Sequence, residues 1–421
     1  MGRINIQFSL VDSTINPFYL CHPCPTVSFR RASTCIGFLF GLLFIDIFDF
    51  KNAPMPNLIE KYANLLVNYC LAVEKGNQVY INASYLAEPL LLEVAKATYI
   101  AGGIPYCNIE LNGFSELVLE YGEEYQLTVI NPLKKLAFEH FDCYLNIRAP
   151  FRRGDGDKEP LDEEKYKLYQ KSQAVLNKIY FDRLGTGAMR RSLCQYPTQA
   201  GADDARMTLE EYEHFVYQSC YLYDENPVSR WLEVRASQQA YVDRLDRADI
   251  VQYKGPNIDM TFSVKGRKWI NSDGRANMPS GEVFSAPVED SVNGWAYFNY
   301  PTIYMGKDVE GVRLEVRDGL IEKWSAEKGQ DILDKVFAVD GARRWGEVAV
   351  GTNMNIQRTS RNILFDEKIG GSIHMAVGQS YKQCGGKNES AIHWDMITDM
   401  RSGGEIIADG EVIYRNGAFI I

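Results

Sequence analysis

Apolar residues recur at regular spacing along the first half of the chain. Between residues 55 and 75 they fall every three or four positions, and Gly76 follows where a helix commonly ends. Residues 78–83 alternate between apolar and polar as a strand does, and residues 88–101 return to helical spacing. Residues 106–111 then resemble a second strand. This order of elements predicts a layered α/β fold with some parallel strands.

The same alternation continues further along the chain. The spacing predicts a helix over residues 133–141 and a strand over residues 144–148. Two more helices are expected over residues 209–223 and 231–245. We therefore predict an N-terminal layered α/β domain over residues 55–250.

After that point the pattern becomes typical of β structure. Glycines and turn dipeptides recur at short intervals between brief apolar runs. These runs cover residues 260–264, 312–316, 347–350 and 373–377. We predict a β-rich α+β domain over residues 251–421, so that the fold class of the whole chain is α/β.

The first 54 residues differ in kind from the rest. Residues 1–54 contain no glutamate, and an apolar run over residues 35–45 follows Arg30 and Arg31, which imitates a signal peptide. The run lies too far along the chain for a signal peptide and is too short to span a bilayer. We interpret residues 1–54 as a non-native or dispensable leader and expect Met55 to be the start. A true targeting or anchoring segment is the alternative.

Composition and charge exclude several classes of protein. Hydrophobic residues make up 46% and charged residues 24% of the 421, which is typical of a globular chain and not of a disordered one. The formal net charge of −10 makes nucleic acid an unexpected partner, and we expect no membrane association. Nine cysteines are too few and too scattered for a disulfide scaffold, so we expect a reducing, cytoplasmic setting.

Familiar catalytic motifs are absent from the sequence. The glycine patterns of phosphate-binding loops, the G-x-S-x-G nucleophile elbow and the H-E-x-x-H zinc helix do not occur. Cys21 and Cys24 have the spacing of a metal or redox pair, but no second such pair exists to complete a zinc site. Chance spacing is the favoured interpretation, and the isolated Cys384 is likewise interpreted as a bystander thiol.

Histidines and carboxylates in the last part of the chain form one candidate site. His393 lies two residues before Asp395, and on a strand this spacing points both side chains to the same face. His374 follows a pair of glycines. Donors of this kind, converging from neighbouring β segments, suit Zn, Co or Mn.

Three glutamates extend the candidate site. Glu282 and Glu347 each follow a glycine and precede a valine, an unusually apolar setting for an ionised side chain. A buried carboxylate needs a partner, and a divalent cation is one. Glu367, seven residues before His374, is a weaker candidate. The spacing alone leaves open the alternative of salt-bridged glutamates and core histidines.

Five segments, in order, resemble the signature blocks of the thermophilic metalloaminopeptidase family of the aminopeptidase T and aminopeptidase S type. They are Asn277-Met-Pro-Ser-Gly-Glu-Val-Phe-Ser-Ala-Pro287, Trp345-Gly-Glu-Val-Ala-Val-Gly351, Phe365-Asp-Glu367, His374-Met-Ala-Val-Gly-Gln-Ser-Tyr381 and His393-Trp-Asp-Met-Ile397. Segments 226–231 and 256–267 add to the resemblance, which covers residues 55–421.

The resemblance implies a dinuclear metalloaminopeptidase that cleaves peptide substrates in its C-terminal catalytic domain. It implies two divalent metal ions, Zn, Co or Mn, with Glu347 as the bridging ligand, and it also implies a homodimer. The implied ligands are Glu282, Glu347, Glu367, His374, His393 and Asp395. Tyr381 would act as a catalytic hydroxyl, and Glu282 is our choice of general base, although a ligand role and a base role are not separable at this point.

The expected reaction is removal of N-terminal residues from peptides by metal-activated water. Two divalent ions lower the pKa of a water molecule, polarise a peptide carbonyl and stabilise the oxyanion, while the phenol of Tyr381 donates a hydrogen bond to it. Two alternatives stay open. One is a noncatalytic protein that binds peptide or metal, and the other is a dinuclear hydrolase of another substrate class, such as a phosphoester.

Overall fold

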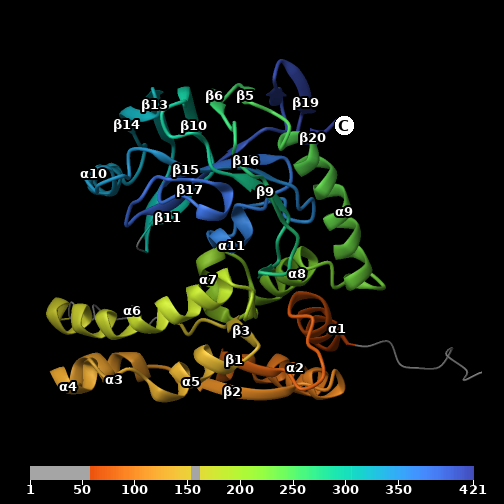
Figure 1. Cartoon of the computed structure of the whole chain (residues 1–421), viewed down its shortest axis with the longest axis vertical. Coiled ribbons are helices and arrows are strands. Elements are labelled where there is room, and N and C mark those ends of the chain that lie inside the picture. The colour runs from red at the N-terminus through yellow and green to blue at the C-terminus, as the bar shows by residue number, and fades with distance from the viewer. Residues whose placement is uncertain (1–56, 153–161, 305) are drawn as a thin grey trace, which may run out of the picture. The chain divides into compact units, whose positions relative to one another are not determined.

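The computed structural model describes residues 57–152, 162–304 and 306–421, which belong to one compact unit (Figure 1). The predicted leader over residues 1–54, with Cys21 and Cys24, lies outside the described residues. Among the helices of the described residues, none is both long enough and apolar enough to cross a membrane.

A parallel sheet forms the first half of the described chain. Its main strands are β1 (Gln78–Ser84), β2 (Ile104–Glu110), β3 (Cys143–Arg148) and β4 (Arg190–Gln195). Their order is β2-β1-β3-β4, and the short strand β8 (Asn277–Met278) joins beside β4 from much later in the sequence. Alternate residues of β1, such as Val79 and Ile81, are fully buried. The predicted parallel strands are therefore present.

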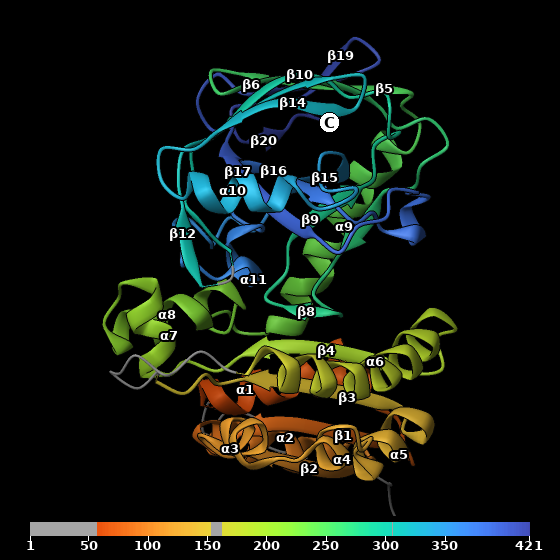
Figure 2. The ribbon, with the colours of Figure 1, turned by 90° about the vertical axis from the view of Figure 1, so that its left-hand side faces the viewer.

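Helices cover both faces of this sheet (Figures 1 and 2). On one face lie α1 (Leu58–Asn64), the π-helix η2 (Leu65–Cys70) and α2 (Glu88–Ile100). The other face carries α3 (Phe114–Tyr121), α4 (Glu124–Leu127), α5 (Pro132–His140) and α6 (Glu163–Gly185). Three helices then lead to the second half: α7 (Gln199–Ala205), α8 (Leu209–Ser219) and α9 (Pro227–Leu245).

Local sequence signals explain where several helices begin. Asn131 caps α5 by accepting hydrogen bonds from the backbone of its first turn, and Pro132 follows at a position that needs no N–H donor. Thr208 and Glu211 form a reciprocal capping box at the start of α8. The predicted ends were less accurate. The helix expected over residues 55–75 already ends at Cys70, and Ala72 takes a positive φ of 45° four residues before Gly76.

The second half contains two antiparallel sheets. The larger sheet has the strand order β14-β13-β10-β6-β5-β18-β19-β20. Its strands are β5 (Ile250–Gly255), β6 (Ile258–Ser263), β10 (Asn293–Phe298), β13 (Val312–Arg317), β14 (Leu320–Ser325), β18 (Glu405–Ala408), β19 (Glu411–Arg415) and β20 (Ala418–Phe419). The helix α10 (Gln330–Phe337) and the hairpin of β11 (Thr302–Tyr304) and β12 (Lys307–Val309) complete this part.

The smaller sheet positions the candidate site. Its order is β17-β16-β15-β9-β7, and the short helix α11 (Ile363–Asp366) lies between β15 and β16 in the sequence. The strands are β7 (Ile270–Ser272), β9 (Glu282–Ser285), β15 (Trp345–Gly351), β16 (Ser372–Gly378) and β17 (His393–Asp399). Every residue of β15 and β16 is buried. A β-rich second half was predicted, and the fold class is confirmed.

Two large apolar clusters hold the described residues together. One cluster draws mainly on the parallel sheet and its helices, from Tyr62 to Trp231, but also includes Phe365 and Ile369 beside α11. The other joins the two antiparallel sheets. Because α11 packs into the first cluster, the two halves of the chain share a core at this point. The domain boundary near residue 250 stays a prediction.

Candidate metal centre

The five-stranded sheet sorts its side chains by strand alternation. On β16, Ile373, Met375 and Val377 belong to the apolar cluster shared with the larger sheet. Successive side chains of a strand point to opposite faces, so His374 and Ala376 lie on the other face. One face of the sheet is therefore apolar core, and the other is free to carry ligating groups.

Strand register brings the candidate residues together on this second face. Ala376 lies opposite Glu347 of β15 on one side and opposite Asp395 of β17 on the other. His374 and His393 each lie two residues from a member of this row, so they share its face. The row thus has one carboxylate on each side of Ala376. Because the alanine side chain is small, there is room between the two carboxylates.

Two further glutamates reach the same site. Glu282 begins β9 and pairs with Gly351 of β15. The preceding Gly281 has a φ of +113°, and a Cβ there would lie 2.7 Å from the Cβ of Asn353, so the site requires glycine before its glutamate. Glu367 follows α11 directly.

The distances between these side chains are short. His374 Nε2 lies 3.4 Å from Glu282 Oε2 and 3.7 Å from Glu347 Oε1. His393 Nε2 lies 3.2 Å from Glu347 Oε2 and 3.7 Å from Asp395 Oδ1. In the described residues, two groups have ligand atoms within 4.8 Å of one another: Glu282, Glu367 and His374; and Glu347, His374 and Asp395. Both groups combine imidazole and carboxylate donors, as sites for Zn, Co or Mn do.

Several polar atoms of this cluster are buried without a hydrogen-bond partner. They include Glu282 Oε2, both ring nitrogens of His374 and Asp395 Oδ1. Burial of polar or charged atoms without a partner is costly, and in native proteins such atoms almost always have one. A divalent cation between them would provide the missing partner. The donor set therefore fits a bound metal ion.

A backbone contact orients His393 toward the centre. Its Nδ1 lies 2.8 Å from the carbonyl oxygen of Gln379, which can only accept, so Nδ1 carries the proton. Nε2 is thereby left to face Glu347 and Asp395. Outer hydrogen bonds of this kind fix the tautomer and ring orientation of metal-ligating histidines.

The crowded carboxylates and imidazoles shift one another's pKa. Burial opposes the charged form of Glu347, but the adjacent imidazoles of His374 and His393 outweigh it and hold the pKa of Glu347 well below its usual range. Burial also opposes protonation of His393, but Glu347 and Asp395 raise its pKa to about 10. Glu347 and Glu282 raise the pKa of His374 against the same effect of burial. Without metal, the surrounding carboxylates therefore favour the protonated form of both imidazoles.

A buried lysine, which no motif in the sequence marks, also belongs to the cluster. Lys368 is fully buried, its Nζ lies 3.4 Å from Glu282 Oε1, and it forms an ion pair with Glu367. Its ammonium thus supplies positive charge between two glutamates that were expected to bind metal. Lysines are seldom fully buried, so a buried lysine is not expected from the sequence. The only signal for Lys368 is its position directly after Glu367.

Tyr381 lies at the edge of the centre. It follows β16, is 39% exposed, and its ring centroid lies 5.0 Å from that of His393 and 5.3 Å from that of Phe284. Desolvation and the nearby carboxylate of Glu347 raise the pKa of the Tyr381 phenol far above its usual range. The hydroxyl therefore stays protonated and is able to donate a hydrogen bond.

Cys384 lies nearby but differs from the ligand candidates. It is fully buried in a small apolar cluster with Phe284, Ala286 and Ala349. Burial raises the pKa of its thiol to about 12, so the sulfur stays protonated and is a poor metal ligand. The interpretation of Cys384 as a bystander agrees with this environment.

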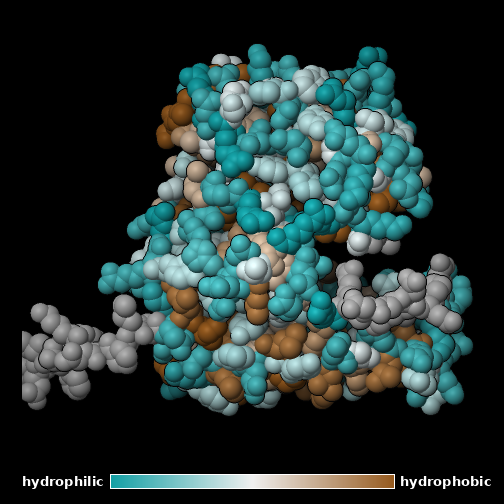
Figure 3. Space-filling view, turned by 180° about the vertical axis from the view of Figure 1, so that it is seen from behind, coloured by the Kyte–Doolittle hydropathy of each residue, from teal (hydrophilic) through white to brown (hydrophobic). Residues whose placement is uncertain are grey.

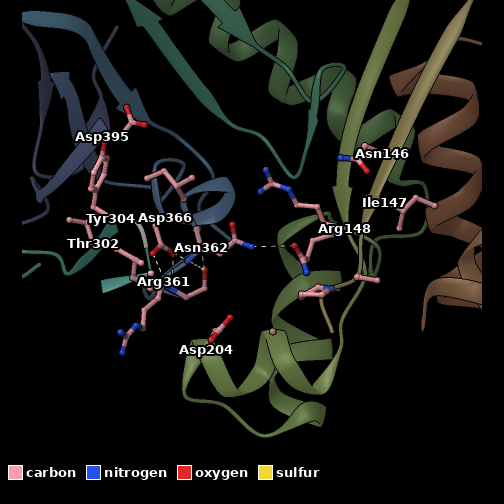
Figure 4. A pocket seen from close by; sticks show the side chains of 18 of the residues that line it. Asn146, Ile147, Arg148, Asp204, Thr302, Tyr304, Arg361, Asn362, Asp366 and Asp395 are labelled. Atoms are coloured by element: carbon pink, nitrogen blue, oxygen red, sulfur yellow. Dashed lines mark hydrogen bonds between the residues drawn. The ribbon is translucent and has the colours of Figure 1, made fainter. Parts of the chain in front are cut away.

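The centre opens into a cavity of about 970 Å³ (Figure 4). His393 and Asp395 line one side, and Asn82, Asn146 and Arg148 line another. These last three residues lie toward the carboxyl ends of the parallel strands β1 and β3, the usual location of ligand sites on parallel sheets. The cavity is thus built by both halves of the chain.

Comparison with known proteins decides the family. The family model described as thermophilic metalloprotease (M29) matches residues 55–419, which is most of the chain. The chain belongs to the M29 thermophilic metalloprotease family. The resemblance inferred from the signature blocks is thereby confirmed, and the family implies a bound divalent metal ion, which the buried donor cluster fits.

The similarity to curated relatives covers nearly the whole length of those proteins. Aminopeptidase 2 of Geobacillus stearothermophilus is 27% identical over 85% of this chain and 97% of its own. Aminopeptidase AmpS of Bacillus subtilis shows the same identity and the same coverage. The solved structure of wild-type AmpT from Thermus thermophilus covers 86% of this chain and 99% of its own with a TM-score of 0.72. At 22% identity, that structure supports the M29 fold described above.

Proposed function

We propose that the chain is a metal-dependent aminopeptidase that removes N-terminal residues from peptides. The observation that carries this proposal is the cluster of buried, unpartnered carboxylate and imidazole atoms, which faces a cavity in a chain of a metalloprotease family. Curated relatives of nearly equal span are named aminopeptidases, which supports the exopeptidase assignment.

We propose that the centre binds two divalent ions, Zn, Co or Mn. Their ligands would be Glu282, Glu347, Glu367, His374, His393 and Asp395, all within the predicted catalytic domain over residues 251–421. The two oxygens of Glu347 face different histidines, which supports its role as the bridge. Ligation by Glu367 requires it to exchange its ion pair with Lys368 for a metal ion.

The side chains around the ions have separate tasks. Bound divalent ions supply Lewis-acid chemistry, which activates water and polarises the peptide carbonyl. We assign the role of general base to Glu282, because its Oε2 lies in the centre without a hydrogen-bond partner. The protonated hydroxyl of Tyr381 donates a hydrogen bond to the oxyanion that develops as the carbonyl is attacked.

The acidic character of the centre favours the end of a peptide over its middle. Glu282, Glu347 and Asp395 concentrate negative charge in the centre. A free α-amino group is protonated or strongly polar at neutral pH, so these carboxylates attract it. We infer that this attraction brings the first peptide bond near Tyr381 and disfavours internal bonds.

Hydrolysis assays with and without chelator test the proposal. We expect release of the chromophore from aminoacyl-nitroanilides, loss of activity on chelation and recovery with Zn, Co or Mn. A phosphomonoester should stay intact under the same conditions. Full activity of the metal-free protein would refute the mechanism, and phosphomonoester hydrolysis without peptide hydrolysis would reassign the substrate class.

We further propose a homodimer. The edge strand β2 of the parallel sheet exposes Ile104, Tyr106 and Ile109, and the neighbouring helix α2 exposes Tyr99 and Ile100. Apolar surface also gathers over the lower part of the view in Figure 3, where this sheet and its helices lie. An exposed edge strand with apolar side chains is a template for a second chain. Sedimentation velocity should give a dimer for the wild type and a monomer for Ile109→Lys.

We also propose that the enzyme works in a reducing, cytoplasmic compartment. Six cysteines lie in the described residues and all are free thiols, five of them buried. Buried thiols without disulfide partners are typical of proteins that are kept reduced. Thiol titration of the unfolded protein, purified without reductant, should detect at least these six groups among the nine cysteines of the chain.

A further inference from the structure

The cavity beside the metal centre carries groups that metal binding does not use. From His393 and Asp395 it extends to the carboxyl ends of β1 and β3. There Asn82 donates hydrogen bonds to Asn146 and to Glu110. These three residues form a line of polar side chains across neighbouring strands. Such groups are able to bind a polar, extended ligand next to the centre.

Three lysine and arginine side chains line this cavity, and they differ in their partners. Arg361 forms an ion pair with Asp308. Lys134 lies over the ring of Phe138, 5.5 Å from its centroid. Arg148 has neither an ion pair nor a side-chain hydrogen bond with any other of the described residues. It is therefore the cation of the cavity that is available to an anionic ligand.

The position of Arg148 follows from its strand. β3 alternates between buried residues, such as Leu145 and Ile147, and residues on the other face, of which Arg148 is the last. Figure 4 shows that its side chain points across the pocket, toward the side on which Asn362 lies. Desolvation and the nearby Arg191 lower the pKa of the Arg148 guanidinium, and no carboxylate offsets them.

We propose that Arg148 binds the C-terminal carboxylate of short peptides, so that the enzyme prefers short peptides with a free C-terminus. This rests on the proposed aminopeptidase function. Guanidinium and carboxylate form a pair of parallel, charge-assisted hydrogen bonds, which accounts for an arginine at this place. A cavity of about 970 Å³ is at the upper end of the range for small-ligand sites, which suits a peptide of a few residues. The N-terminal end lies at the metal centre and the C-terminal end at Arg148.

The test compares the tripeptide Leu-Gly-Gly with its C-terminal amide, using the metal-loaded enzyme. The two substrates share every group except the terminal carboxylate. For the wild type we expect kcat/KM for the free acid Leu-Gly-Gly to be on the order of 10- to 100-fold higher than for its amide. This is the effect expected from one hydrogen-bonded charge. In Arg148→Gln we expect this ratio to fall toward one, mainly through KM.

Controls separate this role from others. Arg317→Gln removes an exposed arginine of β13, at 73% side-chain exposure, and should leave the acid-to-amide ratio unchanged. Arg148→Lys should recover part of the preference, since it restores the charge without the planar fork.

Each outcome decides a different point. A wild-type enzyme without preference for the acid overturns this proposal, even if Arg148→Gln fails to fold. If Arg148→Gln lowers kcat/KM equally for the acid and the amide, the proposal is also overturned, and Arg148 then has a role in chemistry or folding. If the metal-loaded wild type cleaves neither tripeptide nor aminoacyl-nitroanilide, the proposed function itself fails. Cleavage of the nitroanilide without an acid preference refutes the role of Arg148 alone.

Discussion

At the scale of single residues, the metal centre depends on buried groups that lack ordinary partners. Glu282, His374 and Asp395 retain buried polar atoms without hydrogen bonds, whereas Lys368 offsets part of the negative charge around them. A buried charge without a counter-charge is very unfavourable. Without metal, the side chains of the centre therefore form an ion-pair network. With metal, the same side chains would serve as ligands.

Tyr381→Phe tests the role of the phenol. It removes the hydroxyl and keeps the ring that contacts His393 and Phe284. We expect kcat to fall by roughly 10²–10³, as when one oxyanion donor is lost, with KM little changed. Metal per chain, measured by elemental analysis, should stay constant. Tyr125→Phe, at an exposed tyrosine, is the control. Loss of metal in parallel with rate would make Tyr381 a ligand instead.

Lys368→Met tests the ion-pair network. The variant leaves Glu282 and Glu367 without their buried cation, and breaking such a pair costs about 3–5 kcal/mol. We expect the melting temperature of the chelated protein to fall by several degrees and added Zn, Co or Mn to raise it more than in the wild type. Lys335→Met, an exposed lysine of α10, should change neither value. An unchanged melting temperature of chelated Lys368→Met would contradict this role.

At the scale of elements, strand alternation and register assemble the site. The spacing of His393 and Asp395, two residues apart, implied a common face only if the segment was a strand, which β17 is. Which strand neighbours which was not readable from spacing. The row formed by Glu347, Ala376 and Asp395 depends on hydrogen bonds between segments far apart in the sequence.

Ala376→Val tests that row. The added methyl groups enter the space between Glu347 and Asp395, where a metal ion would lie. We expect metal affinity, measured by titration calorimetry, to fall at least tenfold, with circular dichroism unchanged. Met375→Leu changes the opposite, apolar face at nearly constant volume and should keep full affinity. Unimpaired binding in Ala376→Val would place the metal elsewhere.

At the scale of the whole molecule, metal binding and folding stability are coupled through protons. His393 has a folded-state pKa of about 10, well above the usual value near 6.5. Its protonated form stabilises the metal-free protein below about pH 6.5, and this contribution is lost as the pH rises toward 10. A ligating histidine is a neutral imidazole, so binding of metal to the doubly protonated His393 must release a proton.

The expected result is a difference between two melting curves. The melting temperature of the chelated protein should decrease steadily between pH 6.5 and pH 10, whereas that of the metal-loaded protein should change much less. In His393→Gln the chelated protein should lose most of this pH dependence. Equal slopes for chelated and metal-loaded wild type would contradict the coupling.

Local patterns in the sequence determined much of this protein. Apolar periodicity predicted the parallel strands β1, β2 and β3 and most helices, and the glycine-flanked glutamates and the His-x-Asp pair marked the candidate ligands. β4 was missed because its sequence Arg-Arg-Ser-Leu-Cys-Gln does not show an apolar alternation, although Ser192 and Cys194 are buried. Patterns of this kind depend only on neighbours along the chain, so they are visible without a structure.

Only the tertiary structure decided which residues share the centre and the cavity. Lysine is a residue type expected at the surface. The burial of Lys368 between Glu282 and Glu367 results from packing of α11 against the first apolar cluster. Arg148 ends a strand more than two hundred residues before His393, yet both line one cavity. Such proximity depends on contacts between distant segments, and no spacing along the chain encodes them.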